Sequence, residues 1–201
     1  FCRASICDEF GNFRCTKATK NFNYVMAGAA DHVIVAAEKV VKIGEMDPDT
    51  FAVPGVVVEG IVEGEPKWLF DAGNATIDGD IVYNEADKQY HLFYKQESGR
   101  GIYQAVAKQL TDKWEMLQGN VEQTKESVEG VGVCKTIDGK SWIVMYDCYG
   151  NGHYQFCRSE DLKTFHFVQN TATQGIFTPR HGTIIPITQA EKERLLKKFG
   201  E

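Results

Sequence analysis

The sequence has no hydrophobic run long enough to cross a membrane. Its apolar stretches are interrupted every few positions by Asp, Glu, Lys or Gly, whereas a membrane-spanning helix needs about 20 apolar residues. It also lacks an excess of basic residues, because it contains 22 Lys and Arg against 28 Asp and Glu, which gives a net charge of −6. Proteins that bind a phosphate backbone need clustered positive charge. The sequence therefore predicts neither a membrane protein nor a nucleic-acid-binding protein.

The cysteines form neither a disulfide framework nor a metal motif. No Cys-x-x-Cys pair is present, and no histidine stands near a cysteine at the usual zinc-ligand spacing. We therefore expect reduced, mostly buried thiols, as in a cytoplasmic protein. The chain starts at Phe1 without a recognisable signal peptide, which we interpret as a lost start. The six cysteines are Cys2, Cys7, Cys15, Cys134, Cys148 and Cys157.

Motifs of several enzyme classes are missing as well. The sequence contains no Gly-rich phosphate-binding loop, no Ser-His-Asp order and no His-x-Glu metal motif. Phosphoryl transfer and catalysis by a serine nucleophile are therefore excluded as first hypotheses.

Two different patterns follow one another along the chain. Residues 31–64 contain the apolar runs HVIVAAEKVV and VVVEGIV around the polar connection GEMDPDTFAVPG, which is typical of an α/β layer. From Pro66 onward, short alternating strands such as YHLFYK and WIVMYD are separated by polar turns. This pattern predicts an antiparallel β architecture.

The second region repeats itself. Residues 77–82, 128–133 and 180–185 each place a polar residue and Gly before an alternating apolar strand, and the polar residues are Asp78, Glu129 and His181. A four-stranded unit repeating at about 50 residues is the signature of a β-propeller blade. We therefore predict about three blades of a partial propeller. The first strand of each blade lines the axis, so the two carboxylates and the imidazole should converge on a hydrolytic site.

Residues 68–201 resemble the C-terminal half of a glycoside hydrolase family 43 enzyme. The resemblance rests on TIDGDIVYN, YHLFYKQE, VEGVGVCK, WIVMYDCY, RSEDLKTF and FTPRHGTIIPIT. It implies a five-bladed propeller that hydrolyses arabinose-, xylose- or galactose-containing plant-type glycans with inversion. By motif, Glu129 matches the general acid, Asp78 the aspartate that tunes it, and His181 a position that helps hold a metal ion, commonly calcium. Arg180, Asp147 and Tyr149 are candidate substrate-binding residues.

Each candidate residue also has a plain structural interpretation. Asp78 could be an ordinary turn aspartate, and Glu129 a solvated carboxylate, although its apolar surround favours desolvation and a raised pKa. His181 could be a core histidine, since one imidazole makes a weak calcium site. Asp147 and Tyr149 suit a turn equally well. For the tryptophans, packing in the core outranks a sugar platform.

Residues 8–63 resemble something else, the C-terminal part of the alpha subunit of a family I coenzyme A transferase. The motifs are D-x-x-GN, NFN-x-x-MA-x-AAD, V-x-x-GE-x-DPD and the PG before the last strand. In that family the catalytic glutamate belongs to the beta subunit, so a separate beta subunit is the partner that the resemblance implies. The fold class is therefore mixed, with an α/β part over 1–64 and a mainly β part over 65–201.

The family 43 resemblance is incomplete, because nothing here matches the base aspartate of the first blade. We therefore expect glycosidase activity to be impaired, and we interpret the chain as two severed enzymes joined by a recombined or misassembled gene rather than as a natural fusion. Two alternatives stay open. The chain could act as part of a coenzyme A transferase alpha subunit, or as a non-catalytic chimeric product that binds glycans weakly.

Overall fold

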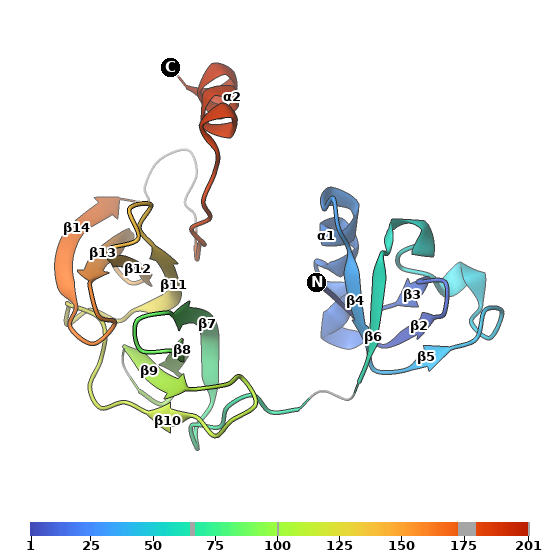
Figure 1. Ribbon diagram of the computed structural model, residues 1–201, viewed down its shortest axis with the longest axis horizontal. Coiled ribbons are helices and arrows are strands. Elements are labelled where there is room, and N and C mark those ends of the chain that lie inside the picture. Colours follow the sequence, from blue (N-terminus) through green and yellow to red (C-terminus); the bar gives the residue numbers. More distant parts are fainter. Residues whose placement is uncertain (65–66, 100, 173–179, 201) are drawn as a thin grey trace. The chain divides into compact units, whose positions relative to one another are not determined.

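The chain forms two compact units, residues 1–68 and 69–201, drawn in Figure 1. The computed structural model describes residues 1–64, 67–99, 101–172 and 180–200. The predicted domain boundary, between residues 64 and 65, falls next to residues 65–66, which lie outside the described residues. Among the described residues, most regular structure is β, and no helix has the length and apolarity to cross a membrane.

The first unit is an α/β layer built on two small sheets. Strands β1 (Cys2–Ala4), β4 (Ile34–Ala37) and β6 (Gly60–Glu63) form a parallel sheet in the order β1-β4-β6. Strands β2 (Ile6–Asp8), β3 (Phe13–Arg14) and β5 (Val40–Val41) form the second, in the order β3-β2-β5. Helix α1 (Asn23–Ala29) buries Ala27 in the core of this unit. Three 3-10 helices complete it: Lys17–Lys20, Pro48–Thr50 and Gly55–Val57.

The predicted run HVIVAAEKVV is therefore two strands rather than one. β4 pairs with β1 and β6, whereas β5 pairs with β2 in the other sheet. The polar pair Glu38–Lys39 separates the two strands, and the hydrogen bonds of each half go to a different partner.

The D-x-x-GN motif has a structural role in this unit. The buried carboxylate of Asp8 accepts hydrogen bonds from the backbone N–H of Phe10 (3.0 Å) and Asn12 (2.9 Å), and from the Asn12 side chain (2.8 Å). Asn12 Oδ1 in turn accepts from the Gly55 N–H at 2.7 Å. A buried carboxylate is tolerated only when it is satisfied in this way, so the motif organises the loop.

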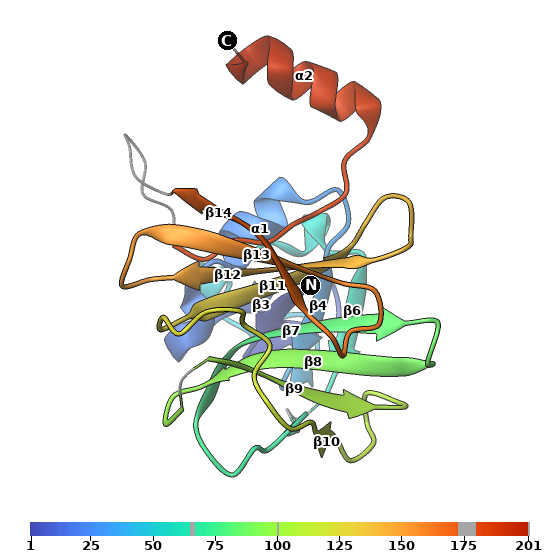
Figure 2. The ribbon, with the colours of Figure 1, turned by 90° about the vertical axis from the view of Figure 1, so that its left-hand side faces the viewer.

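The second unit contains two four-stranded antiparallel meanders, which lie next to one another in Figure 2. The first comprises β7 (Thr76–Asn84), β8 (Gln89–Gln96), β9 (Ile102–Ala107) and β10 (Glu115–Met116). The second comprises β11 (Glu129–Lys135), β12 (Trp142–Cys148), β13 (His153–Ser159) and β14 (His166–Ala172). Neither sheet closes on itself, and their first strands, β7 and β11, are neighbours.

One core cluster joins the two meanders. Phe93 of β8 and Ile102 of β9 are fully buried, and they belong to the same cluster as Val144 and Tyr146 of β12. Burying one such side chain stabilises the fold by about 1.5–3 kcal/mol. This shared core fixes the position of β7 relative to β11, on which the site below depends.

The third expected repeat does not form a sheet. Residues 180–185 carry no strand hydrogen bonds, and the chain continues into helix α2 (Gln189–Phe199), in which no residue is buried. A strand exists only through hydrogen bonds to a neighbour, and the chain after Thr188 is helical. The described residues therefore contain two four-stranded sheets rather than three.

Other expectations about side chains have mixed outcomes. All six cysteines are free thiols, and all except Cys134 are buried, as predicted. Trp114 and Trp142 are buried, so their core role is confirmed, whereas Trp68 is 90% exposed. The core prediction is wrong for Trp68.

Candidate active site

The backbone bends at the start of β7 and of β11 in the same way. Each strand has an irregularity in its ladder, between Ile77 and Asp80 in β7 and between Glu129 and Gly132 in β11. Such bulges re-aim side chains and are common next to active sites. By ladder position, Ile77 corresponds to Glu129, because Ile77 pairs with Lys95 and Glu129 with Asp147.

The predicted alignment of the repeats is therefore wrong by one residue. The left-handed backbone conformation falls at Asp78 (φ 54°), Gly130 (φ 63°) and His181 (φ 57°), so these three positions correspond. Glu129 stands one position earlier than predicted. Spacing in the sequence does not reveal this shift, since either alignment gives a repeat of about 50 residues.

Despite that shift, the three predicted residues meet. The Gly130 N–H donates to Asp78 Oδ2 at 2.9 Å. His181 Nε2 lies 3.2 Å from Glu129 Oε1, and His181 Nδ1 lies 3.7 Å from Asp78 Oδ1. One ligand atom of each of these side chains lies within 4.8 Å of the others.

Glycines in β11 allow the segment around His181 to approach. A Cβ on Gly130 would stand 2.8 Å from His181 Cδ2, closer than side chains tolerate. A Cβ on Gly132 would stand 3.3 Å from the Gly182 carbonyl oxygen. The glycines of VEGVGV therefore make room for His181 beside Glu129.

Arg180 ties the remaining candidates to this cluster. Its Nη2 donates to Glu129 Oε1, and its Nε donates to Asp147 Oδ2 at 2.5 Å. The guanidinium also lies 5.7 Å from the Tyr149 ring centroid, within cation–π range. Asp147 is 1% exposed, and a buried carboxylate needs such a partner. Asp147 raises the pKa of Arg180 further, so the guanidinium stays charged.

The cluster is open to solvent on one side. The side chains of Asp78 and Glu129 are each 18% exposed, whereas those of His181 and Arg180 are about half exposed. A hollow of about 280 Å³ adjoins Asp78, with an apolar and aromatic lining that includes Phe70 and Tyr94. A ligand in this hollow would therefore lie against Asp78.

Two further residues, Lys95 and Asp80, lie on the strands next to this cluster. Lys95 stands opposite Ile77 as Asp147 stands opposite Glu129, and its Nζ binds Glu97 at 2.8 Å. Glu97 raises the pKa of Lys95, with smaller contributions from Tyr149 and Glu129. Burial raises the pKa of Asp80, although the Val133 N–H donates to it at 2.6 Å. Lys95 could have been found from the sequence by its position near the end of the motif YHLFYKQE.

Calcium stays a prediction, and the donor set counts against it. Ca²⁺ takes six to eight oxygen ligands, whereas this cluster offers two carboxylates and an imidazole. One of those carboxylates, Glu129, already binds the cationic Arg180. A guanidinium at that oxygen competes with a metal ion, so we assign no step to calcium.

The first unit is similar to coenzyme A transferases. Residues 1–64 match the coenzyme A transferase family model. A probable coenzyme A transferase alpha subunit of Bacillus subtilis (strain 168) is 44% identical over 74 residues, covering 35% of this chain and 32% of that protein. An acetate CoA-transferase alpha subunit of Escherichia coli (strain K12) is 38% identical over 60 residues, covering 30% of this chain and 27% of that protein. The chain thus spans a third or less of the length of these relatives, and the predicted resemblance is confirmed.

The second unit is similar to glycoside hydrolases. A family 43 β-1,3-galactosidase solved with galactodeoxynojirimycin covers 50% of this chain and 36% of its own, at 15% identity and a TM-score of 0.37. The match to a thermostable family 43 glycoside hydrolase covers 57% of this chain and 46% of that enzyme's chain, at 19% identity and a TM-score of 0.40. Residues 62–193, more than half of the chain, match the family model of a probable glycosyl hydrolase domain related to family 43. The chain therefore belongs to this family of glycosyl hydrolase domains related to glycoside hydrolase family 43.

Proposed function

We propose that the chain is a carbohydrate-active protein of the glycoside hydrolase type, with Glu129 as proton donor to the glycosidic oxygen. The proposed substrates are arabinose-, xylose- or galactose-containing glycans. The observation that carries the proposal is the convergence of Asp78, Glu129 and Arg180 at the solvent-open start of β7 and β11. Two carboxylates with a cation and an imidazole suit acid–base hydrolysis.

The proposed roles follow from the contacts. Asp78 accepts the Gly130 N–H and so orients the backbone that carries Glu129. Arg180 and Tyr149 are exposed enough to bind sugar hydroxyls. Glu129 is engaged by Arg180, and a general acid must be free to approach the glycosidic oxygen. We therefore expect a bound glycan to displace Arg180 from Glu129.

The two meanders also support the proposal that this unit is part of a propeller. Each has four antiparallel strands in chain order, and the first strands of the two are neighbours. This is the arrangement of adjacent blades around an axis.

We further propose that hydrolysis by this chain is impaired. An inverting glycosidase needs a second carboxylate about 6.5–9.5 Å from the acid to activate water, and no residue here matches the base of the first blade. Losing a general base costs about 10²- to 10⁴-fold in rate. A small anionic nucleophile can replace the activated water.

Azide tests both proposals on phenyl α-arabinofuranoside, β-xyloside and β-galactoside. Azide attacks the anomeric carbon as the bond to the phenolic oxygen breaks, and the Glu129 proton passes to that oxygen. We expect slow phenol release that azide accelerates, with loss of the acceleration in Glu129→Gln but not in the exposed control Glu160→Gln. Acceleration that persists in Glu129→Gln would refute the role of Glu129. Steady turnover without azide would refute the impairment.

A second candidate function belongs to the first unit. We propose that residues 1–64 can dock on the beta subunit of a coenzyme A transferase, which supplies the catalytic glutamate in the family they resemble. The match of residues 1–64 to that family favours this candidate. Two assays test it, coenzyme A exchange and co-purification with a bacterial beta subunit, and failure to co-purify would contradict it.

The free thiols suit a proposed cytoplasmic location.

A further inference from the structure

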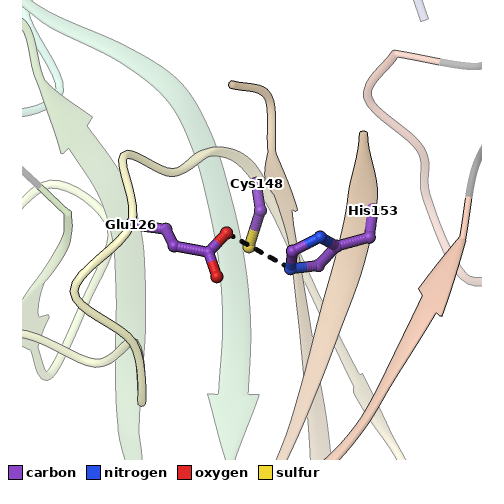
Figure 3. Close-up of side chains that lie close together, drawn as sticks. All are labelled: Glu126, Cys148 and His153. Atoms are coloured by element: carbon purple, nitrogen blue, oxygen red, sulfur yellow. Dashed lines mark ion pairs between the residues drawn. The ribbon is translucent and has the colours of Figure 1, made fainter. Parts of the chain in front are cut away.

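A second cluster of chemically reactive side chains lies in the second meander, apart from the proposed glycan site. It comprises Glu126, in the loop before β11, Cys148 at the end of β12 and His153 at the start of β13. Figure 3 shows the three side chains pointing toward one another, with their carboxylate, thiol and imidazole atoms all within 4.8 Å. The sequence analysis did not take this cysteine and histidine for metal ligands, although His153 follows Cys148 by five residues.

The hairpin preorganises two of the three groups. Cys148 and His153 are direct partners in the antiparallel ladder between β12 and β13, so their side chains stand on the same face of the sheet. The connecting turn is closed by a hydrogen bond from the Asn151 N–H to the Cys148 carbonyl at 2.9 Å. Gly152 (φ 67°) supplies the left-handed residue this turn needs.

The third group is held at a suitable distance. Glu126 Oε2 lies 3.3 Å from His153 Nε2. Tetrahedral coordination with metal–nitrogen and metal–oxygen bonds of about 2.0–2.2 Å places two ligand atoms about 3.4 Å apart. Asn151 Nδ2 donates to the same Glu126 oxygen at 2.5 Å, as the outer partners of metal ligands do.

The polar groups of this cluster are incompletely satisfied. His153 Nε2 is buried and makes no hydrogen bond of good geometry within the described part of the chain, although it faces Glu126. Cys148 is fully buried. Because it is buried, a substrate cannot reach this thiol, which excludes a nucleophilic role.

We propose that Glu126, Cys148 and His153 bind one divalent metal ion of the zinc class. Thiolate, imidazole and carboxylate are the ligands that zinc prefers, and two negative ligands neutralise its charge. Three protein ligands leave one position for water, on the side where Glu126 is 31% exposed. The metal would tie the β12–β13 turn to the loop before β11 and so brace Asp147 and Tyr149, which flank Cys148.

Cobalt titration of the 201-residue chain tests the site directly. With Co²⁺ we expect one equivalent to give a sulfur-to-cobalt charge-transfer band, which Zn²⁺ abolishes by competition. Cys148→Ser should remove the band, and Glu126→Gln or His153→Gln should weaken binding at least tenfold. Asn151→Ala should weaken it about 10- to 100-fold. Cys134→Ser, in the same meander, is the matched control and should bind as the wild type does.

Folding is checked by circular dichroism for each variant. Because Cys148 is in the core, the more exposed Glu126→Gln keeps the test valid if Cys148→Ser fails to fold. No thiolate band in the wild type, or the same binding in Glu126→Gln as in the wild type, would overturn the proposal. The result is independent of glycosidase activity, since metal binding is read without any sugar.

Discussion

Replacing Gly130 with Ala tests the packing that brings His181 to Glu129. Gly130 has φ 63°, and a Cβ there would stand 2.8 Å from His181 Cδ2 and 2.9 Å from His181 Cγ. The left-handed conformation costs an alanine about 1–2 kcal/mol, of which about 0.4–1 kcal/mol is offset because alanine restricts the unfolded chain. Displacing the imidazole adds about 1–2 kcal/mol, as overpacking does.

Gly139→Ala is the matched control for this substitution. Gly139 has φ 70°, but nothing lies within 4 Å of the position that a Cβ would take there, so only the backbone penalty applies. In urea unfolding followed by tryptophan fluorescence, we expect Gly130→Ala to lose about 1–2 kcal/mol more than Gly139→Ala. The imidazole resonances of His181 should shift in Gly130→Ala alone. Equal losses in the two variants, with His181 unmoved, would refute the packing.

Three other perturbations have definite expected outcomes. Burial lowers the pKa of His91, so as the pH falls the unfolded chain takes up the proton before the folded chain does. Stability should therefore fall as the pH drops below about 6.5. The urea midpoints at pH 7.5 and 5.5 should differ less in His91→Gln than in the wild type, and an equal difference in the two would contradict this. Asp8→Ala leaves two backbone N–H groups without their hydrogen-bond acceptor and should lower the stability of the first unit by about 2–3 kcal/mol. Hydrogen exchange should become faster in residues 1–64 but not in residues 101–172. Arg180→Met leaves Asp147 buried without its cation. Because Arg180 is half exposed, the expected cost is about 1–2 kcal/mol, between that of an exposed and that of a fully buried pair. A urea midpoint equal to that of the wild type would argue against the ion pair.

Much of the architecture could be predicted because it depends on local pattern. The change from β-branched runs to alternating strands separates the α/β unit from the meanders, and the repeat brought Asp78, Glu129 and His181 together. The repeat could not fix their register, because two alignments that differ by one residue have almost the same spacing. The matching bulges at 77–80 and 129–132, which distinguish the two alignments, leave no mark in the sequence. The third sheet failed for a related reason, since an alternating pattern indicates a strand but does not supply its partner.

The cluster of Glu126, Cys148 and His153 shows a second limit. Cys148 and His153 are five residues apart, and only the four-residue turn between them makes them ladder partners. Glu126 comes from a separate loop, where it binds Asn151. Such a set is visible only after the hairpin register is known.

The central claim is that a sugar binds where Asp78, Glu129 and Arg180 meet. The Gly130 backbone amide reports on this place, because it donates to Asp78 Oδ2 at 2.9 Å. The most direct measurement is a nitrogen–proton correlation NMR titration with the phenyl α-arabinofuranoside, β-xyloside and β-galactoside named above. We predict that the Gly130 amide is among the signals that shift most, and that Glu129→Gln reduces the shift. Shifts confined to the hollow around Arg158 and His166, or none at saturating ligand, would contradict the account.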